Sequence, residues 1–486
     1  MSSSDTKPGL QANCFFFYYQ QLRSPFGHLT ICLCMNYRKS VFLFVSLLIW
    51  GFSGSVHSQS YPSQWTLQNC IDYALKHNIQ LQKSIISKSQ SEAELEQSRS
   101  SLLPTLSAST NQNVSWRPFS ESTVNLSGGT FTSSSNEVSY NGSYGINANW
   151  TVWNGGILQQ NVKKNRLSTE IAEQNIQETA NSIQEQIVNY YVQILYQDEA
   201  VKVNKEIAEG AKVQRDRAKE MVEVGSLARA DLAQMEAQLS QDEYNVVNSD
   251  VQLSTTKLQL KQLLELAMLD QFDVAIPTID DSQVLTPLPS KRDVYNAARS
   301  LRPEINAAEL NVESSKIDLS IAKRGYYPTI SLMAGIGSSN SSASDDAIFT
   351  QLKNNMNNSL GLSVSVPIFD GKQNKTNVTR AKLSQQNSEL DLQNAEQALY
   401  SQIETYWLNA KNAQQQYIYA KSNLASNEAS YELLDAQFNV GLKNIAELIT
   451  GKNNLIQAKQ QLLQSKYTAL LNIALLKFYE GYEMRL

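Results

Sequence analysis

The chain has 486 residues, 18% of them charged and 42% hydrophobic, which is enough for two domain-sized units or one elongated duplicated unit. The formal net charge of -5 does not indicate a basic surface, which argues against nucleic acid as a partner. With only 4 cysteines and 3 histidines, the composition gives little support for a metal centre or for an enzyme.

Residues 1–58 have the pattern of a leader that includes a secretory signal peptide. The basic residue Arg38 is followed by an apolar run from Val41 to Trp50 and by small residues around Ser58. The run is shorter than the roughly 20 residues that a helix needs to cross a bilayer. Because Met35 lies just ahead of this signal, we expect translation to begin there.

Removal of the leader would leave Cys70 and His77 as the remaining cysteine and histidine. A lone thiol forms no internal disulfide, and no cysteine follows the predicted cleavage site to carry a lipid anchor. The two residues lie seven positions apart on one predicted helix, without further ligands at close spacing. We interpret them as a buried thiol near a surface imidazole and predict neither a metal nor a cofactor.

The mature chain begins with a helix predicted from about Trp65 to Leu102 and ended by Pro104. Residues 105–116 are predicted to be extended, and a Ser/Gly/Thr-rich loop is expected around 119–137. The hydrophobic period then becomes two, so residues 138–152 predict a long strand with one apolar and one polar face.

Long helices follow, because residues 157–276 and 368–486 contain no proline. Within the first block, the helix predicted from Ile157 to Val224 would be roughly 100 Å long at about 1.5 Å per residue. Nothing of that length packs inside one compact domain. The fold class is therefore mainly α-helical and built on very long helices.

The same order of elements returns in the second half of the chain. The expected elements are a helix at 292–324, a strand at 330–336, a Ser/Asn-rich loop at 337–357 and a strand at 360–368. The proline-rich residues 269–290 are predicted to be a linker. The first repeat is then 59–268 and the second repeat is 291–486.

The two halves match at a constant spacing. Trp153-Asn154-Gly155 returns 216 positions later as Phe369-Asp370-Gly371, and Val224-Gly225 returns as Val440-Gly441. Apolar residues between these points map without a gap and step by seven, four and three, as in a coiled-coil seam. These residues are Ile176, Ile183, Ile187 and Tyr190, matched by Leu392, Leu399, Ile403 and Tyr406.

Strands of about 10 residues with one apolar face suit a tilted membrane-crossing strand. Four such strands cannot close a barrel, which takes at least about eight, and an open edge in lipid would leave backbone groups unpaired. The barrel must be shared between chains. Two or three copies satisfy closure, and the strand count alone does not choose between them.

Several short motifs recur in a fixed order along the mature chain. They are the opening Leu67–Leu75 with Asn78, Leu103-Pro104-Thr105-Leu106, Tyr327-Pro328-Thr329-Ile330, Trp153-Asn154-Gly155-Gly156, Ile368-Phe369-Asp370-Gly371, Val224-Gly225 and Val440-Gly441. Each motif is weak alone, but their order and constant offset are specific. Together they resemble the TolC family of outer-membrane efflux channels over essentially the whole mature chain.

This resemblance implies a homotrimer with a shared twelve-stranded β-barrel in the outer membrane and a periplasmic α-barrel of coiled-coil hairpins. The trimer would passively conduct substrates from a periplasmic adaptor (membrane fusion protein) and an inner-membrane transporter to the outside. Lipid of the outer membrane is a further expected partner. The exported substrate is not evident from the sequence.

The resemblance also assigns roles to the helical turns, where adaptors dock. These turn residues are Val224, Gly225, Ser226, Leu227, Val440, Gly441 and Leu442. Glu447 matches an acidic residue of the pore constriction, where three copies would attract cations. The family's second acidic position is Thr450 here, so we expect a weaker single ring.

Asp231 and Lys443 match an acidic and a basic residue that hold the family's entrance shut, and we expect them to form a closed-state lock. A single exposed pair contributes only about 0 to 1 kcal/mol, so threefold repetition would matter. A separate expectation is an interfacial aromatic belt near the strand ends. Its residues would be Trp116, Tyr140, Trp150 and Trp153.

Two other function classes were compared with the channel. A secreted structural or adhesive coiled-coil protein would explain the heptads, but not four one-faced strands inserted at matching places. An enzyme has little support, because the sequence contains no nucleophile elbow and no phosphate loop.

Overall fold

The computed structural model describes residues 64–126, 129–266 and 272–486, which belong to the compact unit Ser63–Leu486. The leader predicted for residues 1–58, with its start at Met35, lies outside the described residues. Among the helices that are described, none combines the length and apolarity needed to cross a membrane.

The prediction of a single first helix is wrong, because the structure has two helices there. Helix α2 (Leu67–His77) and helix α3 (Ile79–Ser100) are separated at Asn78. The Asn78 side chain accepts hydrogen bonds from the backbone of Gln80 and Leu81, as an N-cap does, and donates to the carbonyl of Leu263 at 3.0 Å. An asparagine that caps the second helix and holds a third element therefore breaks the run.

The second copy contains the same break. Helix α7 (Lys291–Leu301) and helix α8 (Pro303–Arg324) replace the single helix expected at 292–324. Arg302 lies between them in an extended conformation with ψ of 125°. A residue before proline avoids the helical region for steric reasons, which explains the break.

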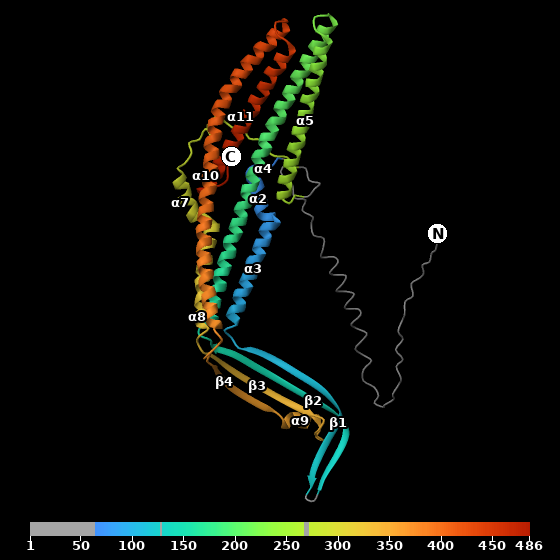
Figure 1. Ribbon diagram of the computed structural model, residues 1–486, viewed down its shortest axis with the longest axis vertical. Coiled ribbons are helices and arrows are strands. Elements are labelled where there is room, and N and C mark those ends of the chain that lie inside the picture. The colour runs from blue at the N-terminus through green and yellow to red at the C-terminus, as the bar shows by residue number, and fades with distance from the viewer. Residues whose placement is uncertain (1–63, 127–128, 267–271) are drawn as a thin grey trace, which may run out of the picture. The chain divides into compact units, whose positions relative to one another are not determined.

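Two helical hairpins form most of the unit (Figure 1). Helices α4 (Ile157–Glu223) and α10 (Gln373–Asn439) each have 67 residues, so each is roughly 100 Å long as predicted. Helices α5 (Arg229–Leu263) and α11 (Ile445–Tyr479) each have 35 residues and pack against them. The equal lengths confirm the duplication.

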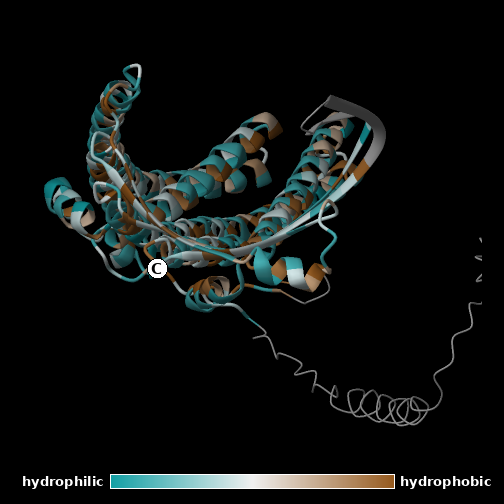
Figure 2. Cartoon of the chain, turned by 90° about the horizontal axis from the view of Figure 1, so that it is seen from below, coloured by the Kyte–Doolittle hydropathy of each residue, from teal (hydrophilic) through white to brown (hydrophobic). Residues whose placement is uncertain are grey.

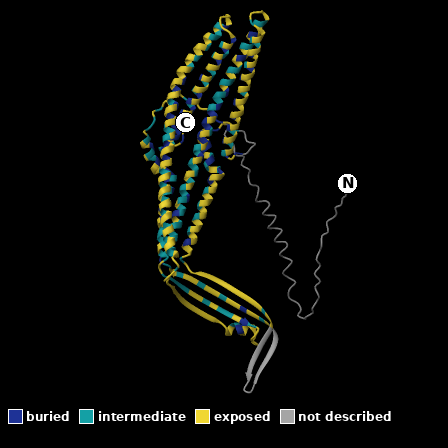
Figure 3. Cartoon of the chain, viewed as in Figure 1, coloured by how far each residue is buried: buried dark blue, intermediate teal, exposed yellow. Residues whose placement is uncertain are grey.

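The predicted seam is buried in part along these helices (Figure 3). Ile183 and Ile187 of α4 are buried, as are their counterparts Leu399 and Ile403 of α10. The linker contains a short helix, α6 (Asp281–Val284), and is fixed to α10, where Trp407 donates to the carbonyl of Pro289 at 2.9 Å.

Four antiparallel strands form one sheet in the order β1-β2-β3-β4. Strand β1 is Thr105–Leu126, β2 is Gly129–Trp153, β3 is Thr329–Ser341 and β4 is Asn357–Ser365. Among the described residues, β1 and β4 are each paired along one side only, so the sheet has two open edges. One chain therefore does not close a barrel.

The loop expected at 119–137 is wrong, because the first hairpin continues through it. The ladder runs to the pair Leu126 and Gly129, with an irregularity between Arg117 and Ser120. Pro118, which lacks a backbone donor, lies in that irregularity. Polar Ser and Thr side chains do not prevent backbone pairing, so composition alone was misleading.

The loop expected at 337–357 is also shorter than predicted. Strand β3 continues to Ser341, and a short helix, α9 (Ile348–Asn354), precedes β4. Helix α9 is held by Gln351, whose side chain accepts from the backbone of Ser341 at 2.8 Å. It lies beside the far ends of β3 and β4 in Figure 1.

The sheet has the two faces that the alternation predicted, because directly paired residues share a face. One face contains mostly uncharged Ser, Thr, Asn and Gly, whereas the other is apolar and exposed. Figure 2 shows residues of different hydropathy along the strands. The exposed apolar residues are Leu106, Val114, Trp116, Val138, Tyr140, Tyr144, Ile146, Trp150, Ile336, Leu360, Leu362 and Val364. Such a surface is unusual for a water-soluble domain and suits contact with lipid.

Candidate functional site: the turns of the two helical hairpins

Both hairpins reverse through the same backbone arrangement. Gly225 and Gly441 have φ of 78° and 74°, a region that side chains other than glycine rarely adopt. The amide of Ser226 donates to the carbonyl of Met221, and that of Leu442 to the carbonyl of Gln437, each at 2.9 Å. This six-residue hydrogen bond with a left-handed glycine is the Schellman motif that ends helices.

The helix after the second turn starts with a strong cap. Asn444 accepts from the amide of Glu447 at 2.9 Å and donates to its carboxylate at 3.1 Å. The Lys443 ammonium is 2.5 Å from the other Glu447 oxygen. Glu447 is therefore held in the first turn of α11, where a negative charge is favourable.

The predicted tip residues are largely exposed. Val224 is 80% exposed, Val440 is 69% exposed and Leu442 is 75% exposed. Gly225, Ser226 and Gly441 are exposed beside them, whereas Leu227 packs into the hairpin. The exposed apolar side chains at both turns form a surface without a partner in the described chain.

The structure brings Lys443 together with Glu447 and not with Asp231. Asp231 lies in the first turn of α5, and in the described part of the chain it makes no ion pair. Thr450 donates to the carbonyl of Ala446 at 2.7 Å, within its own helix. A lock that joins Asp231 to Lys443 between neighbouring subunits stays a prediction, as does the ring of Glu447.

An apolar cluster joins the two hairpins just behind the turns. Its buried members come from all four long helices, and partly buried Leu227, Leu232, Tyr431, Leu434 and Ile449 surround them. The buried members are Ala218, Met235, Phe438, Ile445 and Leu448. The turns are therefore positioned by a shared core and not by each hairpin alone.

Polar contacts between α4 and α10 border this cluster. Gln214 donates to the Tyr431 hydroxyl at 2.5 Å and to Asp435 at 3.1 Å. Arg217 donates to Asn439 at 2.9 Å. Burial is the largest effect on Tyr431 and raises the pKa of its hydroxyl, so the group stays protonated.

A buried ion pair that the sequence analysis missed connects α5 to α11. The Lys452 ammonium lies 2.6 Å from Asp242, and the two side chains are 7% and 2% exposed. The second Asp242 oxygen accepts from Gln238 at 3.0 Å. Both charges occupy seam positions, since Asp242 follows Met235 and Leu239 at coiled-coil spacing. The signal in the sequence that could have identified this pair was one charged residue, of opposite sign, at an apolar seam position of each helix.

The predicted absence of a metal site remains an expectation. In the three described segments, no group of three or more His, Cys, Asp and Glu side chains is placed to hold a metal ion. Cys70 is completely buried, and burial raises the pKa of its thiol to about 12. His77 bonds to the carbonyl of Tyr73 at 3.0 Å and stacks on its ring, so neither residue faces a common ligand.

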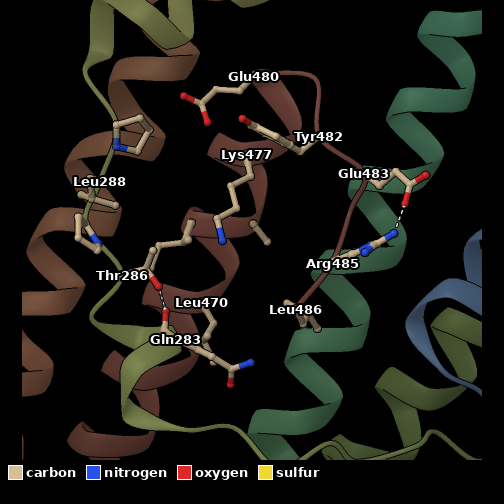
Figure 4. A pocket seen from close by; sticks show the side chains of 14 residues that line it. Gln283, Thr286, Leu288, Leu470, Lys477, Glu480, Tyr482, Glu483, Arg485 and Leu486 are labelled. Carbon is tan, nitrogen blue, oxygen red and sulfur yellow. Dashed lines mark hydrogen bonds and ion pairs between the residues drawn. The ribbon is translucent and has the colours of Figure 1, made fainter.

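A pocket of about 580 Å³ lies toward the opposite end of α11 from the turns (Figure 4). The linker contributes Thr286 and Leu288, and the carboxyl end contributes Tyr482 and Arg485. Arg485 pairs with Glu483 at 2.5 Å. We assign no function to this pocket.

These features define a class of protein, the subunit of an outer-membrane tunnel, in which an open one-faced sheet continues into two long helical hairpins. The model of the outer membrane efflux protein family matches residues 70–265 and 294–481, which is most of the chain. The chain belongs to the outer membrane efflux protein family, and its place is the outer membrane with a periplasmic helical tunnel.

Three similar proteins illustrate the relationship. Outer membrane protein TolC of Escherichia coli K12 is 24% identical over 270 residues, which are 53% of this chain and 53% of that protein. Toxin and drug export protein A of Aggregatibacter actinomycetemcomitans is 20% identical over 412 residues, or 83% of each chain. The CmeC outer membrane channel of Campylobacter jejuni has a TM-score of 0.70 at 19% identity, covering 86% of each chain.

The matches to TolC proteins span only 41% to 59% of their length. The structural likeness at 19% identity shows the shared fold. The shared fold is the arrangement of long helical hairpins and an open sheet described above.

Proposed function

We propose that this protein is the outer-membrane channel of a tripartite efflux or secretion system, in which three copies conduct substrates passively to the outside. The observation that carries the proposal is the four-stranded sheet with two open edges and an exposed apolar face. In lipid, every backbone group of such an edge must be paired, so β4 of one copy must pair with β1 of the next. Three copies would give a ring of twelve strands.

The periplasmic partners in this proposal are an adaptor and an inner-membrane transporter. The exposed side chains of Val224, Val440 and Leu442 supply apolar contacts at the tip for the adaptor. Because the two hairpins have equal lengths, each subunit would present two equivalent turns. The transporter would not need to touch the tip directly.

The entrance in this proposal is controlled by charge at the second turn. Three copies of Glu447 would form an acidic ring, partly neutralised by the Lys443 that pairs with each. If Lys443 bonds to Asp231 of the neighbouring subunit when the entrance closes, Glu447 becomes unpaired and attracts cations. Thr450 places a hydroxyl where a second charge would strengthen the ring.

The alternative of a secreted structural or adhesive coiled-coil protein leaves the sheet unexplained. Such a protein would need no exposed apolar face on four strands. No feature of the described residues favours it over the channel.

Reconstitution tests the proposal directly. Purified protein in detergent should have the mass of a trimer by light scattering, and it should form conducting pores in a planar lipid bilayer. A water-soluble monomer that leaves the bilayer sealed would overturn the channel. In the same recordings, the double variant Asp231→Asn with Lys443→Gln should raise resting conductance, whereas unchanged conductance would remove the lock alone.

A further inference from the structure

Helix α9 occupies a position that a strand would otherwise fill. Strand β4 pairs with β3 only up to the pair Gly337 and Asn357, so the last residues of β3 have no strand on that side. There the side chain of Asn355 donates to the carbonyl of Ser339 at 2.8 Å, and Gln351 accepts from the amide of Ser341 at 2.8 Å. The α9 segment thus satisfies the open edge of β3 with side chains.

The helix is displaced toward the apolar face of the sheet. Ser338 is paired with Tyr144 and belongs to the same face as Ile336. Its hydroxyl donates to the carbonyl of Leu352 in α9 at 2.6 Å. The helix therefore lies beside β3 at the rim, on the side where the apolar residues are exposed.

The opposite side of α9 is apolar and uncovered. Phe349 is 88% exposed and Ile348 is 55% exposed. At 100° per residue, Phe349 lies nearly opposite Gln351, which is buried and bonded to β3. Phe349 therefore projects away from β3, in the direction in which the next strand of a closed ring would lie.

The next strand in such a ring is β1 of another copy. Strand β1 has 22 residues and β4 has nine, so pairing them leaves more than half of β1 without a strand partner. Counting nine residues from Thr105 reaches Asn113, and the unmatched part begins beyond it. Val114 and Trp116 stand there, 65% and 67% exposed, on the apolar face.

We propose that α9 is a clasp between subunits, in which Phe349 and Ile348 pack against Val114 and Trp116 of the partner subunit. The clasp rests on the proposed trimeric channel and extends it. It covers two exposed apolar surfaces at once, and it continues the contact between copies past the point where β4 ends. Three such contacts would brace the rim of the barrel.

Disulfide trapping tests the clasp in the full-length trimer. Phe349→Cys combined with Trp116→Cys should give covalent dimers and trimers on mild oxidation, because the two positions meet across the boundary between copies. Cys70 adds no background, since it is completely buried. Asn354→Cys with Trp116→Cys is the matched control and should give no such products, because Asn354 faces away from Phe349 on the helix.

The outcomes separate the clasp from the channel. Light scattering on the same samples reports whether the trimer is intact, so a trimer without cross-linked products overturns the clasp and leaves the channel standing. A Phe349→Trp variant whose fluorescence is quenched by brominated lipid would assign α9 to the membrane surface and also overturn the clasp. Phe349→Ala should lower the temperature at which the trimer dissociates, and Asn354→Ala should leave it unchanged.

Discussion

Removing the negative charge from the buried pair between α5 and α11 should destabilise the ends of the hairpins. In the variant Asp242→Asn, the Lys452 ammonium stays in the same place, 7% exposed, without a counter-charge. Breaking one partner of a buried ion pair costs about 3–5 kcal/mol, because an uncompensated charge remains in a dry site. The Gln238 side chain cannot replace the lost negative charge. It donates at 3.0 Å to Oδ1 of residue 242, whereas Lys452 lies against Oδ2.

The double variant Asp242→Leu with Lys452→Met separates charge from packing. Replacing both partners by apolar side chains of similar size is often neutral or stabilising, so most of the loss should be recovered. A matched control is Glu206→Gln, which removes the partner of Lys459 in an exposed pair at 3.3 Å. That change should cost at most about 1 kcal/mol, because exposed pairs are weak.

The assay is hydrogen exchange of the amides in α5 and α11 near the turns, measured on the purified protein in detergent. Faster exchange reports the lower free energy of local opening, and a change of about 1.4 kcal/mol alters protection tenfold. The reasoning would be refuted if Asp242→Asn changed protection no more than Glu206→Gln, or if the apolar double variant opened as readily as the single one.

Three further changes have definite expected outcomes. Gly225→Ala should lower stability by about 1 kcal/mol, because its φ of 78° strains a side chain, whereas Gly210→Ala within α4 should raise it by a similar amount; thermal melts would show both directions. Cys70 should resist maleimide in the folded protein at pH 7 and react fully after unfolding, since burial raises the pKa of its thiol to about 12. Mass spectrometry of the labelled protein checks this, and a maleimide adduct on Cys70 of the folded protein would contradict the prediction. Burial, and after it the charge of Glu304, raise the pKa of the Glu178 carboxyl, so the folded state binds this proton more tightly than the unfolded state and loses that stabilisation as pH rises through the raised pKa. Glu178→Gln should therefore melt at the same temperature as the parent at pH 4 and at a slightly higher temperature at pH 7. Equal melting temperatures of parent and variant at both pH values would refute this prediction.

The sequence predicted the long helices well because their information is repeated and periodic. The constant spacing of 216 residues located Gly225 and Gly441, and both have the left-handed conformation expected of such turns. The strand faces were also predicted, since alternation follows directly from backbone geometry. Local signals were thus sufficient wherever one element determined its own structure.

Contacts between distant elements were not predictable in the same way. Asn78 breaks the first helix partly because it reaches the carbonyl of Leu263, and that partner is far away in the chain. The pairing of Lys443 with Glu447 could be anticipated from their spacing of four, but the resemblance directed attention to Asp231. The bond between Asp242 and Lys452 required knowing which seams face each other.

The face of the sheet that carries Ser, Thr, Asn and Gly has a consequence for permeation. Between Thr105 and Ser115 of β1, between Ser139 and Thr151 of β2, and along β3 and β4, that wall offers mainly hydroxyls and amides and carries no fixed charge. An electroneutral, water-like lining treats hydrated anions and cations alike. In the proposed channel, discrimination between cargoes would then occur before they reach the strands, and the last part of the route would only have to let them leave.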